Sequence, residues 1–394
     1  MRRVFITFSH RTPIVPRFGI AKSIPFYTLA ASVIGALIDD IREAQSVLKV
    51  NNGSETLQIH SLIAGNALGA GGNPARLMSL AAGLPEGLPA LSIDSQCCSG
   101  LDAIGLAYQR IQGVPRGYEN QLILAGGAES ASLAPIRLNR ETQKAYEQAP
   151  FTPWPDRDPD MIEAALALES ARELSKSRMV QWALRSYRLS VEDKIGSKAL
   201  ISPRPGVTED TLPRLISDTL CKRAAAFGRY NPCLMAPLAD AAAFCALLCL
   251  DESSLALWKG NSKEITRDHQ RGGPLEILDY HQIGADPKLP GLSCSALLPW
   301  LEDSEERFNF SRSELTVALM ESFSSQVLSS MDDLGLRQEQ VNPWGGLLPR
   351  GHPVGASGAI LVWDLFKRLL PGHLGLAAIP AAGGLASALL VRRV

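Results

Sequence analysis

The sequence predicts an α/β protein made of two similar halves. Its 394 residues exceed the size of one ordinary domain. In about the first 130 residues, strand-like runs alternate with segments of helical periodicity, which is typical of a layered domain with a mostly parallel sheet. Two stretches also repeat each other: CCSGLDAIGLAYQRIQG with LILAGGAES, and GASGAILVWDLFKRLLPG with LAAIPAAGGLAS. In both, Ser-Gly opens an amphipathic helix and the next strand ends in a Gly-Gly turn, so we expect a duplicated unit with the site between the halves.

The elements of the first half follow from local patterns. Apolar residues recur with helical spacing in Pro25–Arg42, and Pro74 suits the first turn of a helix at Asn73–Ala82. A third helix is expected at Gly100–Ile111. Short apolar runs between them predict strands at Val4–Thr7, Ile59–Ile63, Pro89–Ile93 and Gln121–Leu124.

The middle of the chain has a different composition. Residues 133–222 are rich in charge and proline and are interpreted as an inserted loop or cap domain, with a long amphipathic helix around 161–186. The apolar run 240–250 is a buried strand or the start of a helix. We therefore predict an N-terminal half at 1–132 plus 223–255, the insertion at 133–222, and a C-terminal half at 256–394.

Composition excludes several kinds of function. The net charge of −1 provides no basic field for nucleic acid or an anionic membrane. No run approaches the roughly 18 apolar residues that span a bilayer. The seven cysteines contain no CxxC pair, which predicts no metal site and is typical of a reducing compartment, here the cytoplasm.

Cys97 is the first candidate for chemistry. It follows a strand-like run and directly precedes the Ser-Gly that begins a helix, so its sulfur is expected near the unpaired N–H groups of the helix start. A thiol there should be more acidic than a free one, and the thiolate is the reactive form. The alternative is a small core residue, the role we assign to neighbouring Cys98.

His352 is the second candidate. It lies in the glycine-rich run NPWGGLLPRGHPVGASG, Asn342 to Gly358, between Gly351 and a proline. Glycines let a backbone turn sharply and approach a ligand closely. An imidazole in such a loop could take the thiol proton or bind a thioester oxygen.

These motifs together resemble the thiolase superfamily. The run from Ile63 to Ile104 is similar to the family's first catalytic block, AGGAES to the next strand and turn, and Asn342–Gly358 to its histidine block. The resemblance covers nearly the whole chain and is weakest in the insertion. It implies the thiolase fold, with duplicated α/β halves in a five-layered αβαβα core and an inserted loop domain, and a homodimer or a dimer of dimers.

The resemblance also implies roles for single residues. The family uses a cysteine that becomes acylated, a histidine that activates it, an asparagine that holds an oxyanion-hole water, and a second cysteine that removes an α-proton; Cys97 and His352 match the first two. The asparagine position holds Met320 and the second-cysteine position holds Pro380, which can neither hold that water nor carry a proton. The backbone N–H groups of Cys97 and Ala382 could still form an oxyanion hole. Supporting roles are expected for Glu321, Asn342, Gly351, Gly383 and Gly384.

Three functions follow as expectations. In the first, Cys97 takes an acyl group from a CoA or acyl-carrier-protein thioester and passes it to another nucleophile, with the CoA or phosphopantetheine thioester as substrate and no tightly bound cofactor. The second is a thiolase that forms or cleaves C–C bonds, with Glu321 or a water replacing the missing base. The third is a non-catalytic subunit with a partner subunit, which the retained Cys97 and His352 argue against.

Overall fold

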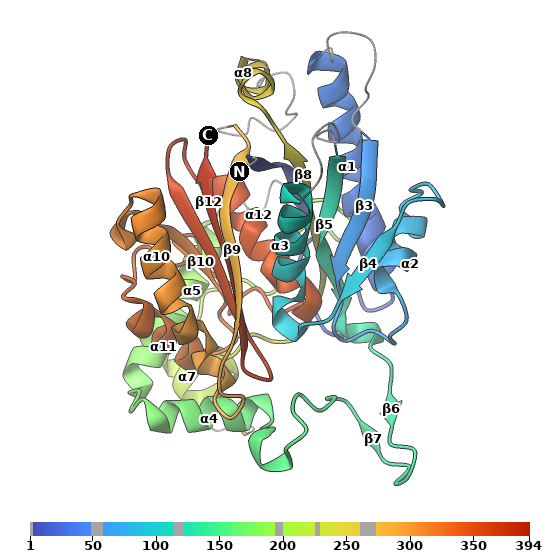
Figure 1. Ribbon diagram of the computed structural model, residues 1–394. Helices are drawn as coiled ribbons and strands as arrows, with labels where there is room; N and C mark the ends of the chain where they lie inside the picture. Colours follow the sequence, from blue (N-terminus) through green and yellow to red (C-terminus); the bar gives the residue numbers. More distant parts are fainter. Residues whose placement is uncertain (1–2, 49–57, 114–120, 194–199, 225–228, 261–272) are drawn as a thin grey trace.

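The computed structural model describes residues 3–48, 58–113, 121–193, 200–224, 229–260 and 273–394, and its centre is one mixed sheet (Figure 1). The strands follow the order β10-β11-β12-β9-β1-β8-β5-β3-β4, with β2 paired to β8. Their bounds are β1 Val4–Arg11, β2 Val15–Pro16, β3 Gln58–Gly65, β4 Ala90–Ile93, β5 Gln121–Ser130, β8 Ala239–Cys249, β9 Leu275–Gly284, β10 Thr316–Leu319, β11 Leu374–Ala381 and β12 Leu385–Arg393. The strands expected in the first half are all present, and 239–249 is a strand.

Helices divide the molecule into five layers. Helices α3 and α12 lie between the two halves of the sheet, and α1 and α2 cover the outer face of the half that contains β3, β5 and β8 (Figure 1). The 3₁₀ segment η5 (Pro290–Leu297) and helices α10 and α11 cover the other outer face. The helix bounds are α1 Phe26–Leu48, α2 Pro74–Ala81, α3 Ser99–Gln112, α10 Leu298–Phe308, α11 Ser324–Leu334 and α12 Ser357–Arg368. The five-layered αβαβα core is confirmed.

The expectation of a mostly parallel sheet is wrong. Only β3 with β4 and β5, and β10 with β11, run parallel; the other pairs in the described chain are antiparallel. Strand β12 follows β11 after a turn of only three residues, and so short a connection can join only antiparallel neighbours.

The internal repeat is present, with one difference. Helix α3 followed by β5 matches α12 followed by β11, but Gly126 and Gly127 lie inside β5 and do not form a turn. A Cβ on Gly126 would lie 2.1 Å from the carbonyl oxygen of Ala243, and one on Gly127 would lie 2.0 Å from that of Gly355. These two glycines therefore permit close backbone approach, whereas only the second Gly-Gly pair forms the expected turn.

Two helices occupy residues 161–192, where one long helix was predicted around 161–186. Helix α4 (Met161–Ala171) ends before Glu173, which has a left-handed φ of 49°, and α5 (Lys176–Glu192) begins after Ser175. The Ser175 hydroxyl caps α5 by accepting from the N–H of Arg178 at 3.2 Å. Helices α4 and α5 pack on α11, and the strands β6 (Arg137–Leu138) and β7 (Ala145–Tyr146) form an arm that extends from the body (Figure 1). Cut points at 132/133, 222/223 and 255/256 stay predictions.

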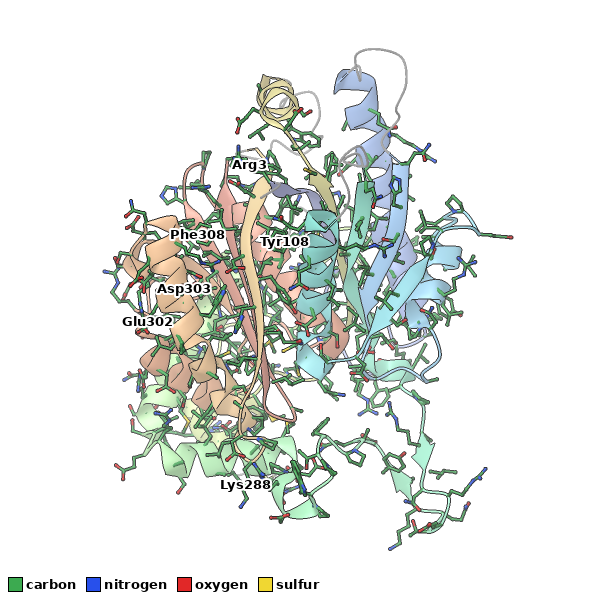
Figure 2. All side chains as sticks on the ribbon, in the orientation of Figure 1. Arg3, Tyr108, Lys288, Glu302, Asp303 and Phe308 are labelled. Carbon is green, nitrogen blue, oxygen red and sulfur yellow. The ribbon has the colours of Figure 1, made fainter. Side chains whose placement is uncertain are left out.

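The two middle helices touch each other at glycines. A Cβ on Gly100 of α3 would lie 2.9 Å from the Gly355 oxygen, and one on Gly358 of α12 would lie 2.5 Å from the nitrogen of Leu101. On the other side of α3, Tyr108 donates to the carbonyl of Leu278 in β9 at 3.3 Å (Figure 2). The N-termini of α3 and α12 are thereby brought together, and the loops that precede them carry the two candidate residues.

Candidate active site

Cys97 and His352 lie in direct contact although 255 positions separate them in the chain. The Cys97 Sγ is 3.1 Å from the His352 Nε2. Cys97 belongs to the 3₁₀ turn η1 (Gln96–Cys98) that precedes α3, and His352 lies just before the equivalent turn η7 (Val354–Ala356) that precedes α12. The structure thus brings together the two residues that the sequence singled out.

The turn before Cys97 is held in a left-handed conformation. Gln96 has a φ of 57°, which is costly for a residue with a side chain. The Ser99 hydroxyl stabilises the turn, because it donates to the Gln96 carbonyl at 2.6 Å and accepts from the N–H of Ser95 at 3.0 Å. The turn leaves the Cys97 sulfur at a cavity, while Cys98 is fully buried, as expected.

The imidazole of His352 is oriented by a serine that sequence analysis did not single out. Its Nδ1 lies 2.7 Å from the Ser357 Oγ, and that hydroxyl donates to the carbonyl of Pro353 at 3.1 Å. Since the hydroxyl proton is used on Pro353, Ser357 accepts from the Nδ1–H. The Nε2 that faces the thiol therefore carries a lone pair and can accept its proton. The signal was present in the sequence as the serine of GASG.

Burial changes the acidity of both groups. Burial raises the pKa of the Cys97 thiol to about 12, although the N–H groups of Ala382 and Cys97 act in the opposite direction. Burial also lowers the pKa of His352 to about 4. The expectation of an acidic resting thiol is therefore wrong, because burial of the sulfur raises its pKa more than the N–H groups near the helix start lower it. At pH 7 the pair is a neutral thiol and a neutral imidazole, so the proton must move as the sulfur attacks.

Two backbone donors point to the space beside the sulfur. The N–H groups of Cys97 and Ala382 lie near the Cys97 sulfur and lower the pKa of its thiol. Ala382 precedes Gly383 and Gly384, whose φ values of 77° and 78° belong to the left-handed region that favours glycine. A Cβ on Gly384 would also lie 2.5 Å from the carbonyl of Ala285. The turn thus brings the Ala382 N–H to the sulfur, in keeping with a backbone oxyanion hole, which stays a prediction.

The altered family positions have no group that could transfer a proton. Met320 is fully buried in the core, and its N–H donates to the carbonyl of Ala378 at 3.0 Å. Pro380 lines a cavity beside Cys97. Hydrocarbon and a thioether thus occupy the two positions that the resemblance assigns to a second cysteine and an asparagine, and this assignment stays a prediction.

Glu321 and Asn342 fasten the histidine loop. The Glu321 carboxylate is fully buried and accepts from Asn342 Nδ2 at 2.9 Å, from Ser186 Oγ at 2.7 Å and from the N–H of Leu348 at 3.1 Å. Asn342 has a left-handed φ of 46°. Glu321 does not line either cavity at Cys97, which argues against it as a replacement base.

Gly351 supports the same loop by its backbone. Its φ is 109°, and a Cβ there would lie 2.9 Å from the Cβ of Ala239 at the start of β8. The next N–H, that of His352, donates to the carbonyl of Pro237 at 2.7 Å. Glycine is needed for this approach, and the resulting contact fixes the backbone of His352.

Glu129, which sequence analysis quoted only within AGGAES, joins the two halves. Its Oε2 accepts from the N–H groups of Ala67, Leu68 and Gly355 at 3.0, 3.1 and 3.0 Å. Its Oε1 accepts from Asn66 Nδ2 at 2.9 Å. Burial raises the pKa of Glu129 to about 7, even though these donors favour the ionised form. One buried carboxyl thus ties the end of β3 to the turn that follows His352.

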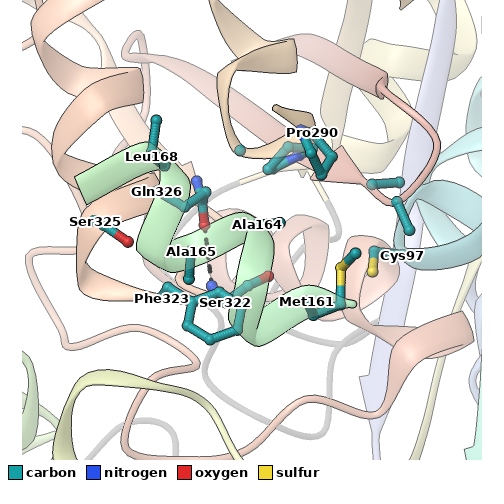
Figure 3. Close-up of a pocket in the computed structure, with 14 residues that line it drawn as sticks. Cys97, Met161, Ala164, Ala165, Leu168, Pro290, Ser322, Phe323, Ser325 and Gln326 are labelled. Atoms are coloured by element: carbon teal, nitrogen blue, oxygen red, sulfur yellow. Dashed lines mark hydrogen bonds between the residues drawn. The ribbon is translucent and has the colours of Figure 1, made fainter. Parts of the chain in front are cut away.

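Cys97 stands where two cavities meet. The wide cavity, of about 390 Å³, is also lined by His352, Gln96, Arg17 and Arg137. The narrow cavity, of about 50 Å³, passes between α4, η5 and the loop before α11 (Figure 3). Cys97, Met161, Ser322, Phe323 and Ala382 line both. A thioester could therefore place its carrier in one space and its acyl group in the other.

In the part of the chain that the structure describes, no three His, Cys, Asp or Glu side chains gather in a way that could hold a metal ion. No helix in the same ranges is long and apolar enough to cross a bilayer.

A five-layered duplicated fold with a Cys–His pair at the junction of its halves is the architecture of the thiolases. The thiolase N-terminal domain model matches residues 4–194, and the thiolase C-terminal domain model matches residues 276–393. The chain belongs to the thiolase family.

Curated relatives and solved structures agree with this assignment. The putative acetyl-CoA C-acetyltransferase VraB of Staphylococcus aureus (strain MRSA252) is 31% identical over 360 residues, which cover 85% of this chain and 88% of the relative. VraB of Staphylococcus haemolyticus is 30% identical over 354 residues, with coverage of 85% and 87%. The crystal structure of the Bacillus anthracis acetyl-CoA acetyltransferase superposes with a TM-score of 0.78 at 25% identity, covering 100% of this chain and 99% of that one. The dimeric peroxisomal thiolase of Saccharomyces cerevisiae gives 0.80 at 20% identity, with coverage of 100% and 98%.

Proposed function

We propose that the protein is an acyltransferase in which Cys97 accepts an acyl group from a thioester of CoA or of a carrier protein. The observation that carries this proposal is the 3.1 Å contact between the Cys97 Sγ and the unprotonated Nε2 of His352, at the junction of two cavities. The absence of an acid or base at Met320 and Pro380 supports transfer to a nucleophile other than an enolate.

The proposed transfer passes through an acyl-Cys97 thioester. The Cys97 sulfur attacks the thioester carbonyl carbon while its proton moves to His352 Nε2, and the oxyanion accepts from the N–H groups of Cys97 and Ala382. The intermediate collapses, the bond to the donor sulfur breaks, and that thiolate takes the proton from the imidazolium. An acceptor nucleophile then gives its proton to His352 Nε2 as it attacks the carbonyl carbon of acyl-Cys97. The bond from that carbon to the Cys97 sulfur breaks, and the sulfur takes the proton back from the imidazolium.

A second candidate is a thiolase that forms or cleaves a C–C bond. The relatives' names, acetyl-CoA C-acetyltransferase and acetyl-CoA acetyltransferase, favour it. Such a reaction needs an α-proton removed and an enolate stabilised, and each lost group typically costs about two to three decades in rate. The buried Glu321 offers no replacement, so we place this function second.

We further propose a homodimer that pairs through the first half of the chain. Strand β4 ends the sheet, and an unpaired edge strand is open to another chain. Leu91 on this strand and Leu77 and Leu80 on the adjacent α2 are exposed. None of the seven cysteines, all of which the structure describes, forms a disulfide, which supports the cytoplasm as the proposed location.

The test is to incubate the protein with acyl-CoA donors and measure its intact mass, with Cys97→Ala as the variant. The matched control is Cys249→Ala, because Cys249 is also part-exposed but lies outside both cavities. We expect an acyl adduct in the wild type and in the control but none in Cys97→Ala. No adduct in the wild type would overturn the proposal. Exchange of acetyl-CoA methyl protons in deuterated buffer would favour the second candidate.

A further inference from the structure

The narrow cavity beside Cys97 has mostly apolar walls, and its uncharged polar side chains besides Cys97 are Ser322, Ser325 and Gln326. It is bounded by one face of α4, by η5, by the start of α11 and by the end of β11 (Figure 3). Its apolar walls come from Met161, Ala164, Ala165, Leu168, Pro290, Phe323, Pro380, Ala381 and Ala382. Among the described residues that line it, none carries a charge.

Gln326, the longest of the polar side chains that line the cavity, is already engaged. The Gln326 Oε1 accepts from the N–H of Ser322 at 3.0 Å, which Figure 3 marks, and its Nε2 donates to Ser330 Oγ at 3.3 Å. A ligand group placed here would find no free charged partner, and burying an unpaired polar or charged group is costly. The space therefore suits hydrocarbon.

The length of the space follows from α4. Met161 begins α4 beside Cys97, and Leu168 closes the far end of the cavity (Figure 3). Seven residues of helix at about 1.5 Å each span about 10 Å. An extended chain advances about 1.3 Å per carbon, given C–C bonds of about 1.5 Å, so about eight carbons fit. Gly291 confirms how tightly Leu168 is held, because a Cβ there would lie 2.7 Å from Leu168 Cδ2.

Resting on the proposed function, we propose that the acyl group accepted by Cys97 is an unbranched, uncharged chain longer than acetyl and up to about eight carbons. The chain lies along α4 with its end at Leu168, while the donor's carrier arm occupies the wide cavity. Replacement of an ionisable cysteine by Pro380 extends the hydrocarbon wall to the reacting sulfur.

The experiment measures the rate of Cys97 acylation by intact mass with acetyl-, butyryl-, octanoyl-, lauroyl- and succinyl-CoA. Each methylene transferred from water into hydrocarbon contributes up to about fourfold. We expect octanoyl-CoA to react at least about tenfold faster than acetyl-CoA, and lauroyl- and succinyl-CoA to react more slowly than octanoyl-CoA. Equal or faster acetyl transfer would overturn this inference and leave the proposed function standing, whereas no acylation by any donor would overturn both.

Two variants on α4 and one control locate the effect. Ala165→Phe fills the cavity and should lower the octanoyl-to-acetyl rate ratio at least about tenfold; Leu168→Ala opens its end and should move the optimum to longer chains. Leu166→Phe is the control, because Leu166 is 45% exposed on the outer side of the same helix, and its ratio should stay at the wild-type value. An unchanged optimum in Leu168→Ala would overturn the assignment even if Ala165→Phe failed to fold.

Discussion

The starts of α3 and α12 share one construction and hold different groups. Each helix follows a short 3₁₀ turn and begins with a buried serine and a glycine. In the first half, Ser99 donates to Gln96 and closes the turn that presents Cys97. In the second half, Ser357 donates to the carbonyl of Pro353 and accepts from the ring of His352. The same serine position thus supports the proposed nucleophile in one half and orients the proposed base in the other.

The position that holds Cys97 in one half cannot hold a side chain in the other. Two residues before Ser99 stands Cys97, and two residues before Ser357 stands Gly355. A Cβ on Gly355 would lie 2.7 Å from the Cα of Asn66 and 3.0 Å from the backbone nitrogen of Ala67, which is closer than ordinary van der Waals contact. The two halves thus share the same turn and helix start, but close packing leaves room for a side chain at this position in only one of them.

The largest expected effect concerns Glu129, which binds both halves. Its pKa of about 7 in the fold exceeds its ordinary value of 4.5, so protonation favours folding. This contribution is complete below about pH 4.5 and is lost as the pH rises through 7, for up to about 3 kcal/mol. Between pH 4.5 and 7 the unfolding free energy of the wild type should therefore fall more steeply than that of Glu129→Gln, as measured by urea denaturation.

The control for this pH dependence is Glu86→Gln, because Glu86 is an exposed carboxylate. It should keep the wild-type slope. If Glu129→Gln kept that slope as well, the buried carboxyl would not be the group that titrates with folding.

A smaller effect is expected where the two helices cross. Gly358→Ala should lower the unfolding free energy by about 2 kcal/mol, because its Cβ would meet the backbone of Leu101 at 2.5 Å. Gly35→Ala in α1 is the matched control: no atom lies within 4 Å of its Cβ, and alanine should raise the unfolding free energy by up to about 1 kcal/mol. Changes of the same sign in both variants would contradict a close crossing at Gly358.

The smallest effects separate the two serines. Ser357→Ala should slow acylation of Cys97 about tenfold, because an imidazole that is no longer oriented should raise the activation free energy by about 1.4 kcal/mol. Ser357→Thr should restore the rate. Ser99→Ala should lower the unfolding free energy by about 1 kcal/mol through loss of a buried hydrogen bond. Intact mass measures the rate of acylation, and urea denaturation measures the unfolding free energy. Equal slowing of acylation by both alanine variants would contradict a special role of Ser357 in orienting the His352 ring.

Much of this molecule is determined locally by its sequence. Helical spacing predicts α1, and Pro74 places the start of α2, because periodicity and proline act over a few residues. The short motifs around Cys97 and His352 likewise predict both as candidates, and the resemblance predicts Met320 and Pro380 as the altered positions. These signals lie within short segments, so no knowledge of distant parts of the chain is needed.

Several properties of the site depend on contacts between distant segments and follow only from the tertiary structure. The pKa of Cys97 rises because several elements together exclude water from its sulfur, and no local pattern records that exclusion. Position 127 needs glycine because the carbonyl of Gly355 approaches it closely. The carboxyl of Glu129 accepts hydrogen bonds from the N–H groups of residues 67, 68 and 355. The narrow cavity likewise exists only where α4 meets η5, α11 and β11. Desolvation and close contact are set by which segments meet in space, and that is fixed only when the whole chain has folded.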